Sequence, residues 1–344
     1  MLRSSMKYGA LRAKVLAMYG KLLSPEDWRR IGECSSVADI ATFLRAQPGW
    51  SDAVSPLSAS PSPSRLKAIL RKKVFSEYEK LFCFAYLEDK KYLLFTLYRA
   101  EYNYVLDALC GLYADASTIK SFDATDFLRA HSSVNIAALE SCRDFPSLLE
   151  AIRGSIFFAP LSRLPLNPET ALPDYRSACI LLENLYFKAI FTYVSKKYRG
   201  DGSKTLAEIL GRSADMLNII SILRLQRFFP GSLPAADSLL VPVSLRLRPA
   251  LLRALISADG ESEAREILKK SPCEKYFKGL DVQKLDNLFD EAMASFCRNL
   301  LRSPEPSICI PQAYLTLREI ECKRLARYIE AASYGLEAGN SFSD

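Results

Sequence analysis

The chain has 344 residues, and its 46 lysines and arginines exceed its 39 aspartates and glutamates, giving a net charge of +7 at pH 7. The single histidine, His131, excludes a histidine-rich zinc or iron site and is the one residue on which a Ser/His/Asp or Cys/His apparatus would depend. A hydrophobic fraction of 49% with only 14 glycines is typical of a globular protein rich in helices.

The cysteines and the apolar runs indicate a cytoplasmic protein. Nine cysteines are present, an odd number, and no two of them form a CxxC pair, so we expect reduced and mostly buried thiols. The N-terminus lacks the apolar core of a signal peptide. No uncharged run reaches the roughly 20 residues that a membrane-spanning helix needs.

Proline placement gives a coarse map of the chain. Stretches 64–145, 174–229 and 312–344 contain no proline and are predicted to hold long helices, because proline disrupts a helix interior. The proline clusters between them are predicted to be loops. One of these, the Ser- and Pro-rich segment 55–64, is expected to be an exposed loop or hinge.

One helical pattern occurs three times along the chain. It begins with an acidic residue at Glu79, Glu183 or Asp286, which is followed by Leu at +2, an aromatic at +3, Ala at +6 and an apolar residue at +7. These positions form one stripe on a helix of 3.6 residues per turn. Each segment is therefore predicted to be an amphipathic helix with an equivalent buried face.

A second helix follows each of these segments. Its acidic anchor is Glu101, Asp215 or Glu321, with apolar residues at +4 and +8 of every copy and Tyr, Met or Cys at +1. A shorter amphipathic stretch precedes each helix pair, at 37–44, 145–152 and 261–268.

The spacing of the anchors predicts three tandem helical domains, at 1–115, 116–232 and 233–344. The interval between first and second anchor is longer in the second and third copies than in the first. Turn-forming residues at 199–204 and 303–306 predict that this extra length forms loops.

The charge is spread along the chain. The three predicted domains carry +5, +3 and −1, a mild gradient without a concentrated basic face. Pairs of lysines at helix ends usually lie in solvent or complement the helix dipole. We therefore expect no nucleic-acid partner.

The second helix of the middle copy has a polar face. Asp215, Asn218, Ser221 and Arg224 follow one another at helical spacing beside the apolar stripe. They are expected to form a polar seam between neighbouring helices, or else a surface that contacts a partner.

Three stretches in this order resemble the C subunit of the archaeal and bacterial A/V-type ATPases, which is the d subunit of the eukaryotic V-type enzyme. The N-terminal stretch is Tyr8-Gly9-Ala10-Leu11-Arg12-Ala13-Lys14 followed by Leu22-Leu23-Ser24-Pro25-Glu26-Asp27, the middle one is Asp215-x-x-Asn218-Ile219-x-x-Ile222-Leu223-Arg224, and the C-terminal one is Ala313-Tyr314-Leu315-x-x-Arg318-Glu319-Ile320-Glu321. The first and third copies of the repeat depart from this pattern, because Tyr104 and Arg324 stand where the middle copy has Asn218.

The resemblance implies a funnel-shaped protein of three similar all-helical domains at the cytoplasmic face of a membrane. One such copy per complex would couple the central stalk of the ATPase to the ring of proteolipid subunits, for ATP-linked transport of protons or sodium ions. It implies no catalytic residue, no cofactor and no metal, and membrane contact through partners only.

Eight polar residues are candidates for partner interfaces or for contacts between helices. They are Arg12, Glu101, Asp215, Asn218, Arg224, Arg318, Glu321 and Arg324.

Two other classes of protein remain open. A generic α-helical adaptor unrelated to an ATPase would share the helices and the repeat. An enzyme with carboxylate chemistry would use a pair such as Glu88 and Asp89, or Glu319 and Glu321. Residues one or two positions apart on a helix do not face each other, which disfavours the enzyme.

Overall fold

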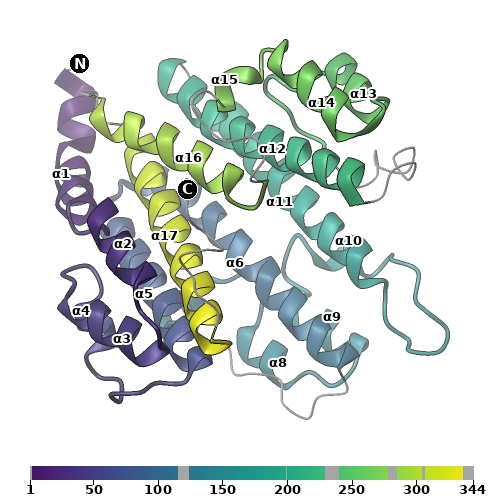
Figure 1. Cartoon of the computed structure of the whole chain (residues 1–344). Helices are drawn as coiled ribbons and strands as arrows, with labels where there is room; N and C mark the ends of the chain where they lie inside the picture. Colours follow the sequence, from purple (N-terminus) through teal and green to yellow (C-terminus); the bar gives the residue numbers. More distant parts are fainter. Residues whose placement is uncertain are drawn as a thin grey trace. The chain divides into compact units, whose positions relative to one another are not determined.

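The computed structural model describes residues 2–114, 124–198, 200–228, 240–277, 285–303 and 307–335. Over these ranges the chain is helical, with one isolated antiparallel bridge between Leu166 and Pro173 and no strand, which confirms the predicted all-α fold (Figure 1). The helices are α1 (Leu2–Tyr19), α2 (Pro25–Gly32), α3 (Val37–Ala46), α4 (Ser51–Val54), α5 (Pro63–Phe84), α6 (Leu87–Tyr113), α7 (Asp126–His131), α8 (Ile136–Ser141), α9 (Phe145–Ala151), α10 (Phe158–Leu161), α11 (Tyr175–Lys197), α12 (Gly200–Phe228), α13 (Pro249–Ile256), α14 (Gly260–Lys269), α15 (Glu274–Phe277), α16 (Leu285–Arg302) and α17 (Cys309–Ser333).

The chain divides into two compact units. Unit 1 comprises Met1–Leu87, Asp123–Phe127 and Phe296–Asp344, and unit 2 comprises Glu88–Phe122 and Leu128–Ser295. Unit 1 therefore combines the two ends of the chain. The division into three tandem domains stays a prediction, and both of its internal boundaries lie outside the described residues.

Unit 1 is built around the C-terminal helix. Helix α17 packs along α5 and also contacts α1 and α3 (Figure 1). Trp50, Leu66, Leu325 and Ile329 are fully buried in one hydrophobic cluster between α17 and the N-terminal helices. Burying side chains of this size stabilises a fold by roughly 1.5–3 kcal/mol each, so α17 is an integral part of the N-terminal core.

The short helices of unit 1 have strong start signals. Ser24 and Asp27 form a capping box at the start of α2, and Ser36 and Asp39 form another at the start of α3. Each box satisfies amide groups that a helix start leaves without a partner. Pro25 supplies the fixed φ of the first turn of α2, where its missing N–H costs nothing.

Unit 2 has its main hydrophobic cluster around α12. Met216, Ile219 and Leu223 on that helix are buried with Leu268 of α14 and Leu288 of α16. Helix α11 packs beside α12. Aromatic pairs also join α6 to α11, and residue numbers rise on one helix as they fall on the other, so these two helices are antiparallel. The pairs are Phe95–Tyr193, Tyr102–Tyr186 and Tyr113–Tyr175.

The apolar positions predicted for the second helix of each copy are all buried. These helices are α6, α12 and α17, and the short stretches ahead of the pairs are α3, α9 and α14. The nine buried positions are Tyr102, Val105 and Leu109 on α6, Met216, Ile219 and Leu223 on α12, and Cys322, Leu325 and Ile329 on α17.

The structure corrects three details of the sequence prediction. Tyr86, predicted to be buried, is 51% exposed, because α5 ends at Phe84 and the stripe does not continue past that end. The predicted loop at 199–204 is mostly helix, since α12 begins at Gly200; in a first turn glycine costs less than in a helix interior. Helix α17 likewise starts inside the last proline cluster, with Pro311 near its N-terminus.

Of the predicted loop at 303–306, residues 304–306 lie outside the described residues.

Candidate functional site

In the structure the acidic anchors of the three second helices are buried carboxylates with similar hydrogen-bond donors. Glu101 of α6 and Asp215 of α12 are 0% exposed and Glu321 of α17 is 5% exposed. Each accepts a hydrogen bond from backbone N–H groups just ahead of a short helix, α8, α13 or α2 respectively. We call each carboxylate, together with the donors it binds, a carboxylate seam.

The Glu321 seam lies in unit 1 and joins α17 to the N-terminal segment. Glu321 accepts from the Leu23 amide at 2.8 Å and from the indole Nε1 of Trp50 at 3.0 Å. It also accepts from Arg318, one turn earlier on α17. A buried carboxylate is stable only when its charge is paired and its oxygens are hydrogen-bonded, and these three donors meet both needs.

Arg318 is the centre of the polar network in unit 1. The side chain is 1% exposed, and its guanidinium stacks over the Trp50 ring at 3.8 Å. It donates to the Gly49 carbonyl at 2.6 Å and to Glu77 of α5 at 3.0 Å. Although burial opposes the charged form, Glu321 and Glu77 raise the pKa of Arg318, so the guanidinium stays charged.

Glu77 extends this network along α5. Its carboxylate accepts from the Tyr314 hydroxyl at 2.6 Å and lies 3.7 Å from Lys73 Nζ, which contacts Asp52 at 2.6 Å. Burial, with Glu77 beside it, raises the pKa of Tyr314, so the hydroxyl remains a donor at neutral pH. Hydrogen bonds and ion pairs of Glu77 and Lys73 therefore connect α17 to α5 and α5 to α4.

The Asp215 seam lies in unit 2 and uses neutral donors. Asp215 accepts from the amides of Leu245, Arg246 and Leu247 at 2.9, 2.6 and 3.3 Å. The hydroxyl of Tyr276 donates to the same carboxylate at 2.6 Å, and burial and this hydrogen bond raise the pKa of Tyr276. One carboxylate thus holds the loop before α13 and the short helix α15.

Asn218, one turn further along α12, binds the same loop. Its side-chain amide donates to the Val241 carbonyl at 3.0 Å and accepts from the Val241 amide at 2.8 Å. A third residue of this helix, Gln226, donates to the carbonyls of Leu255 and Ala258 at the end of α13. Arg224 lies between them on α12 and is exposed.

The Glu101 seam lies in unit 2 and holds the turn before α8. Glu101 accepts from the Ser133 amide at 2.8 Å and from the Ser133 hydroxyl at 2.5 Å. Burial raises the pKa of Glu101, while the bonds from Ser133 and Ser132 partly offset that rise. These donors are neutral, so Glu101 is a buried carboxyl whose ionised form is stabilised by hydrogen bonds alone.

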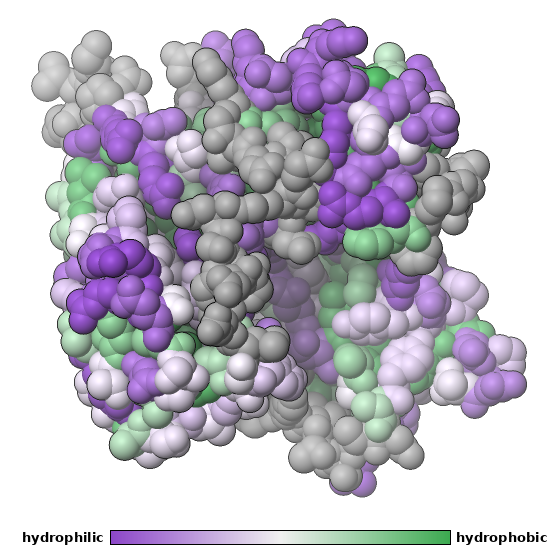
Figure 2. Space-filling model, viewed as in Figure 1, coloured by the Kyte–Doolittle hydropathy of each residue, from purple (hydrophilic) through white to green (hydrophobic). Residues whose placement is uncertain are grey.

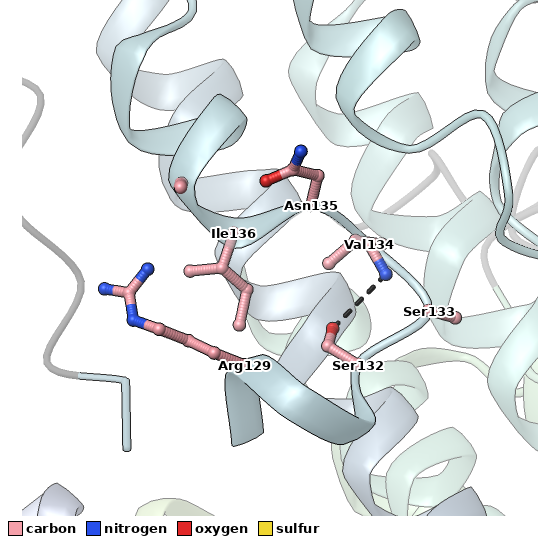
Figure 3. Close-up of a pocket in the computed structure, with 7 residues that line it drawn as sticks. Arg129, Ser132, Ser133, Val134, Asn135 and Ile136 are labelled. Atoms are coloured by element: carbon pink, nitrogen blue, oxygen red, sulfur yellow. Dashed lines mark hydrogen bonds between the residues drawn. The ribbon is translucent and has the colours of Figure 1, made fainter. Parts of the chain in front are cut away.

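A shallow cavity of about 330 Å³ lies at this turn (Figure 3). The polar groups around it have partners: Ser132 Oγ accepts from the Val134 amide, drawn in Figure 3, and Asn135 accepts from the Ala138 amide. Arg129 pairs with Glu140 at 2.8 Å. Ser133, also in the lining, donates its hydroxyl to Glu101, so these polar side chains serve contacts within the chain.

The remaining candidates lie in unit 1. Arg12 of α1 donates to the Ser303 carbonyl at 3.0 Å, and the Arg324 guanidinium is stacked 4.4 Å from the Trp28 ring centroid. The structure thus brings Arg318 and Glu321 together and keeps Arg12 and Arg324 outside their network. Whether any of the eight candidates contacts another protein stays a prediction.

Several side chains that bind the candidate residues were not predicted from the sequence. Trp50, Glu77, Ser133 and Tyr276 were not among the candidates, although they bind the residues that were. A buried carboxylate needs donors, so polar and aromatic residues in the short helices and turns were the available signal. The spacing of the anchors does not indicate which of these residues donate to the carboxylates.

The alternative carboxylate pairs of an enzyme have partners within the chain where they are described. Asp89 is buried and accepts from the Tyr198 hydroxyl at 2.9 Å, and Glu321 belongs to its seam. The described residues contain no group of three or more His, Cys, Asp or Glu side chains arranged to hold a metal ion. Within the same ranges, no helix has the length and apolar character needed to cross a membrane.

These features define an all-helical protein whose buried polar side chains tie its own helices and turns together. The chain belongs to the ATP synthase (C/AC39) subunit family, whose model matches residues 11–340. This result confirms the resemblance to the C subunit of the V/A-type ATPases. A comparison with curated proteins yields no match.

Proposed function

We propose that this protein is the non-catalytic rotor subunit that couples the central stalk of a V/A-type ATPase to its membrane ring of proteolipid subunits. The observation that carries the proposal is the family match over residues 11–340. In this role the protein transmits rotation between the ATP-hydrolysing head and the ring that carries protons or sodium ions. One copy per complex would serve, with no cofactor, metal or nucleic acid.

The carboxylate seams suit a part that carries torque. A protein between two rotating parts must resist shear between its helices, and packed interiors resist deformation because they contain few voids. Buried hydrogen bonds add directional restraint to that packing. The Glu321 seam binds the last long helix to the first short ones, where a twisting load would otherwise separate them.

The proposed location is the cytoplasmic face of the membrane, held there by the complex. The absence of a candidate membrane-spanning helix in the described residues fits a peripheral subunit. The eight polar candidates remain candidates for contacts with the stalk or the ring, and Arg224 is the clearest of them because its side chain is exposed.

A pull-down from native membranes tests the proposal. The tagged protein is isolated in mild detergent, and we expect the proteolipid and central-stalk subunits to be recovered with it at fixed ratios. The purified protein alone should not hydrolyse ATP. Recovery of the tagged protein with neither the proteolipid nor the central-stalk subunits would contradict the assignment and favour the generic helical adaptor.

An Arg224→Glu variant sharpens the pull-down. If Arg224 contacts the stalk or the ring, charge reversal should lower recovery of that partner and leave the helix content unchanged by circular dichroism. Arg176→Glu, an exposed charge reversal on α11, is the matched control. Equal recovery with both variants would remove Arg224 from the proposed interface.

A further inference from the structure

Two packed helices of unit 1 have a net charge as large as that of the whole chain. Helix α1 has four cationic residues and no acidic one, and α5 has six cationic residues and two acidic ones. Together they carry +8, whereas the whole chain carries +7. The two helices contact each other, so these charges lie close together in space, although Lys67 and Lys73 pair with Glu330 and Asp52 of neighbouring helices.

Exposed aromatic rings lie among these cations. Phe84, at the end of α5, is 47% exposed and Tyr86 is 51% exposed. Lys14 Nζ lies 5.5 Å from the Phe84 ring centroid, and Lys7 Nζ lies 5.7 Å from that of Tyr86. Lys80, also exposed, precedes Phe84 by one helical turn. We call these five residues the basic–aromatic surface.

Figure 2 shows hydrophobic and hydrophilic residues intermixed along the left edge of the molecule, where Figure 1 draws α1. Glu79 is the one exposed acidic residue of α5, since its other acidic residue, Glu77, is buried. Cations therefore outnumber the single acid among the exposed residues of α5.

The residue types indicate what this surface binds. Protein–protein interfaces are enriched in arginine and depleted of lysine, whereas the cations beside the Phe84 and Tyr86 rings are Lys14 and Lys7. Lysines near an anionic lipid surface contribute about 1 kcal/mol each, and tyrosine and phenylalanine place an apolar ring at the level of the headgroups. Exposed rings flanked by lysines thus match the chemistry of an anionic bilayer surface.

We propose that Lys7, Lys14, Lys80, Phe84 and Tyr86 bind anionic phospholipid headgroups directly. This goes beyond the coupling function, in which the protein reaches the membrane through its partners only. The lysines attract the anionic surface, and the rings of Phe84 and Tyr86 enter the headgroup layer. Such a contact adds a second attachment of the protein to the membrane.

Vesicle flotation with the purified full chain tests the proposal. We expect binding to vesicles of phosphatidylcholine with phosphatidylglycerol, weak binding to phosphatidylcholine alone, and loss of binding at about 1 M salt, where the Debye length is only about 3 Å. The Lys7→Gln/Lys14→Gln variant should bind about 30-fold more weakly, which corresponds to about 2 kcal/mol for two lysines. Lys196→Gln/Lys197→Gln removes the same charge from exposed positions of α11 and should bind as the wild type does.

A Phe84→Trp variant tests the aromatic part. Brominated phosphatidylglycerol should quench its fluorescence more than that of the wild type, whose two tryptophans are the fully buried Trp50 and the partly buried Trp28. Absence of quenching would remove the rings from the contact and overturn the proposal as stated.

Other outcomes would also overturn it. They are failure of the wild type to bind anionic vesicles, an equal loss in both lysine variants, or retention on a polyglutamate matrix without vesicle binding, which would indicate an acidic protein partner instead. The assay contains no ATPase subunit, so its result is independent of the pull-down that tests the coupling function.

Discussion

The Glu321 seam of unit 1 and the Asp215 seam of unit 2 achieve the same end by different means. Glu321 is neutralised by Arg318 of its own helix, and that arginine also reaches Glu77 and the Gly49 carbonyl. Asp215 instead receives three backbone amides and a tyrosine hydroxyl, all of them neutral donors. One seam is an ion-pair network and the other is an amide-bound carboxylate.

The difference indicates where each unit is vulnerable. In an ion-pair network the loss of one charge leaves another charge buried without a partner, so the cost is concentrated in one side chain. In an amide-bound carboxylate the charge is shared among several donors, and the loss of one of them leaves the others in place. Unit 1 should therefore depend strongly on Arg318, and unit 2 should lose less stability when any single donor to Asp215 is removed.

The largest expected effect comes from Arg318→Ala. Because it leaves Glu321 buried without a cation and removes one of the two cations beside Glu77, we expect the free energy of unfolding to fall by about 3–5 kcal/mol. Urea denaturation measures this loss. Hydrogen exchange should rise in α17 and α5 while α12 and α14 keep their protection.

Arg29→Ala is the control for that substitution, because Arg29 is 67% exposed in its pair with Glu26 and should contribute little to the free energy of unfolding. A similar small loss for Arg318→Ala would contradict the view that unit 1 depends on its central arginine.

A matched pair of tyrosine substitutions gives an intermediate effect. Tyr276→Phe removes one donor from Asp215 and Tyr314→Phe removes one from Glu77, each at 2.6 Å. A buried hydrogen bond to a charged group contributes about 1.5–3 kcal/mol. We expect about 2 kcal/mol for Tyr276→Phe and less for Tyr314→Phe, because Arg318 and Lys73 still neutralise Glu77. The reverse order in urea denaturation would contradict the distinction between the two seams.

The smallest expected effect concerns Glu101, and it depends on pH. The pKa of Glu101 is raised above the ordinary 4.5, so between 4.5 and the raised value the folded protein binds more protons than the unfolded chain. The contribution of Glu101 to the free energy of unfolding therefore falls as the pH rises through that window, by at most about 1.4 kcal/mol for each step of one in pH.

Glu101→Gln has no charge to bury and lacks this dependence. The stability of the variant relative to the wild type should thus improve from pH 4.5 toward 7, as measured by denaturation at several pH values. A difference between the two proteins that does not change with pH would show that Glu101 has no raised pKa.

The helices were predictable because their signal is local. Ile219 and Leu223 recur at +4 and +8 from Asp215, and burial of that stripe needs no information from elsewhere in the chain. The start of α12 at Gly200 was not predictable in this way, because Gly-Asp-Gly favours a turn when read alone and the helix that follows decides its conformation.

The carboxylates of the seams were predictable from the local sequence, whereas their donors were not. An acidic residue beside a buried stripe marks Glu321 as unusual, but its donors are Leu23 and Trp50, which only the folded chain brings to it. Backbone amides carry no sequence signature, so the three amides that bind Asp215 could not be inferred from residue types. The basic–aromatic surface was not predicted, because the net charge of a 115-residue domain does not show that two of its helices, α1 and α5, pack together.

The bond between the Leu23 amide and Glu321 also sets an order of events during synthesis. The two residues are 298 positions apart, so at roughly 5–20 residues per second the ribosome makes the acceptor about 15–60 s after the donor. Most of unit 2 emerges in between and can fold first. The core of unit 1 stays uncovered until α17 has been translated, so the N-terminal helices cannot complete their packing before then.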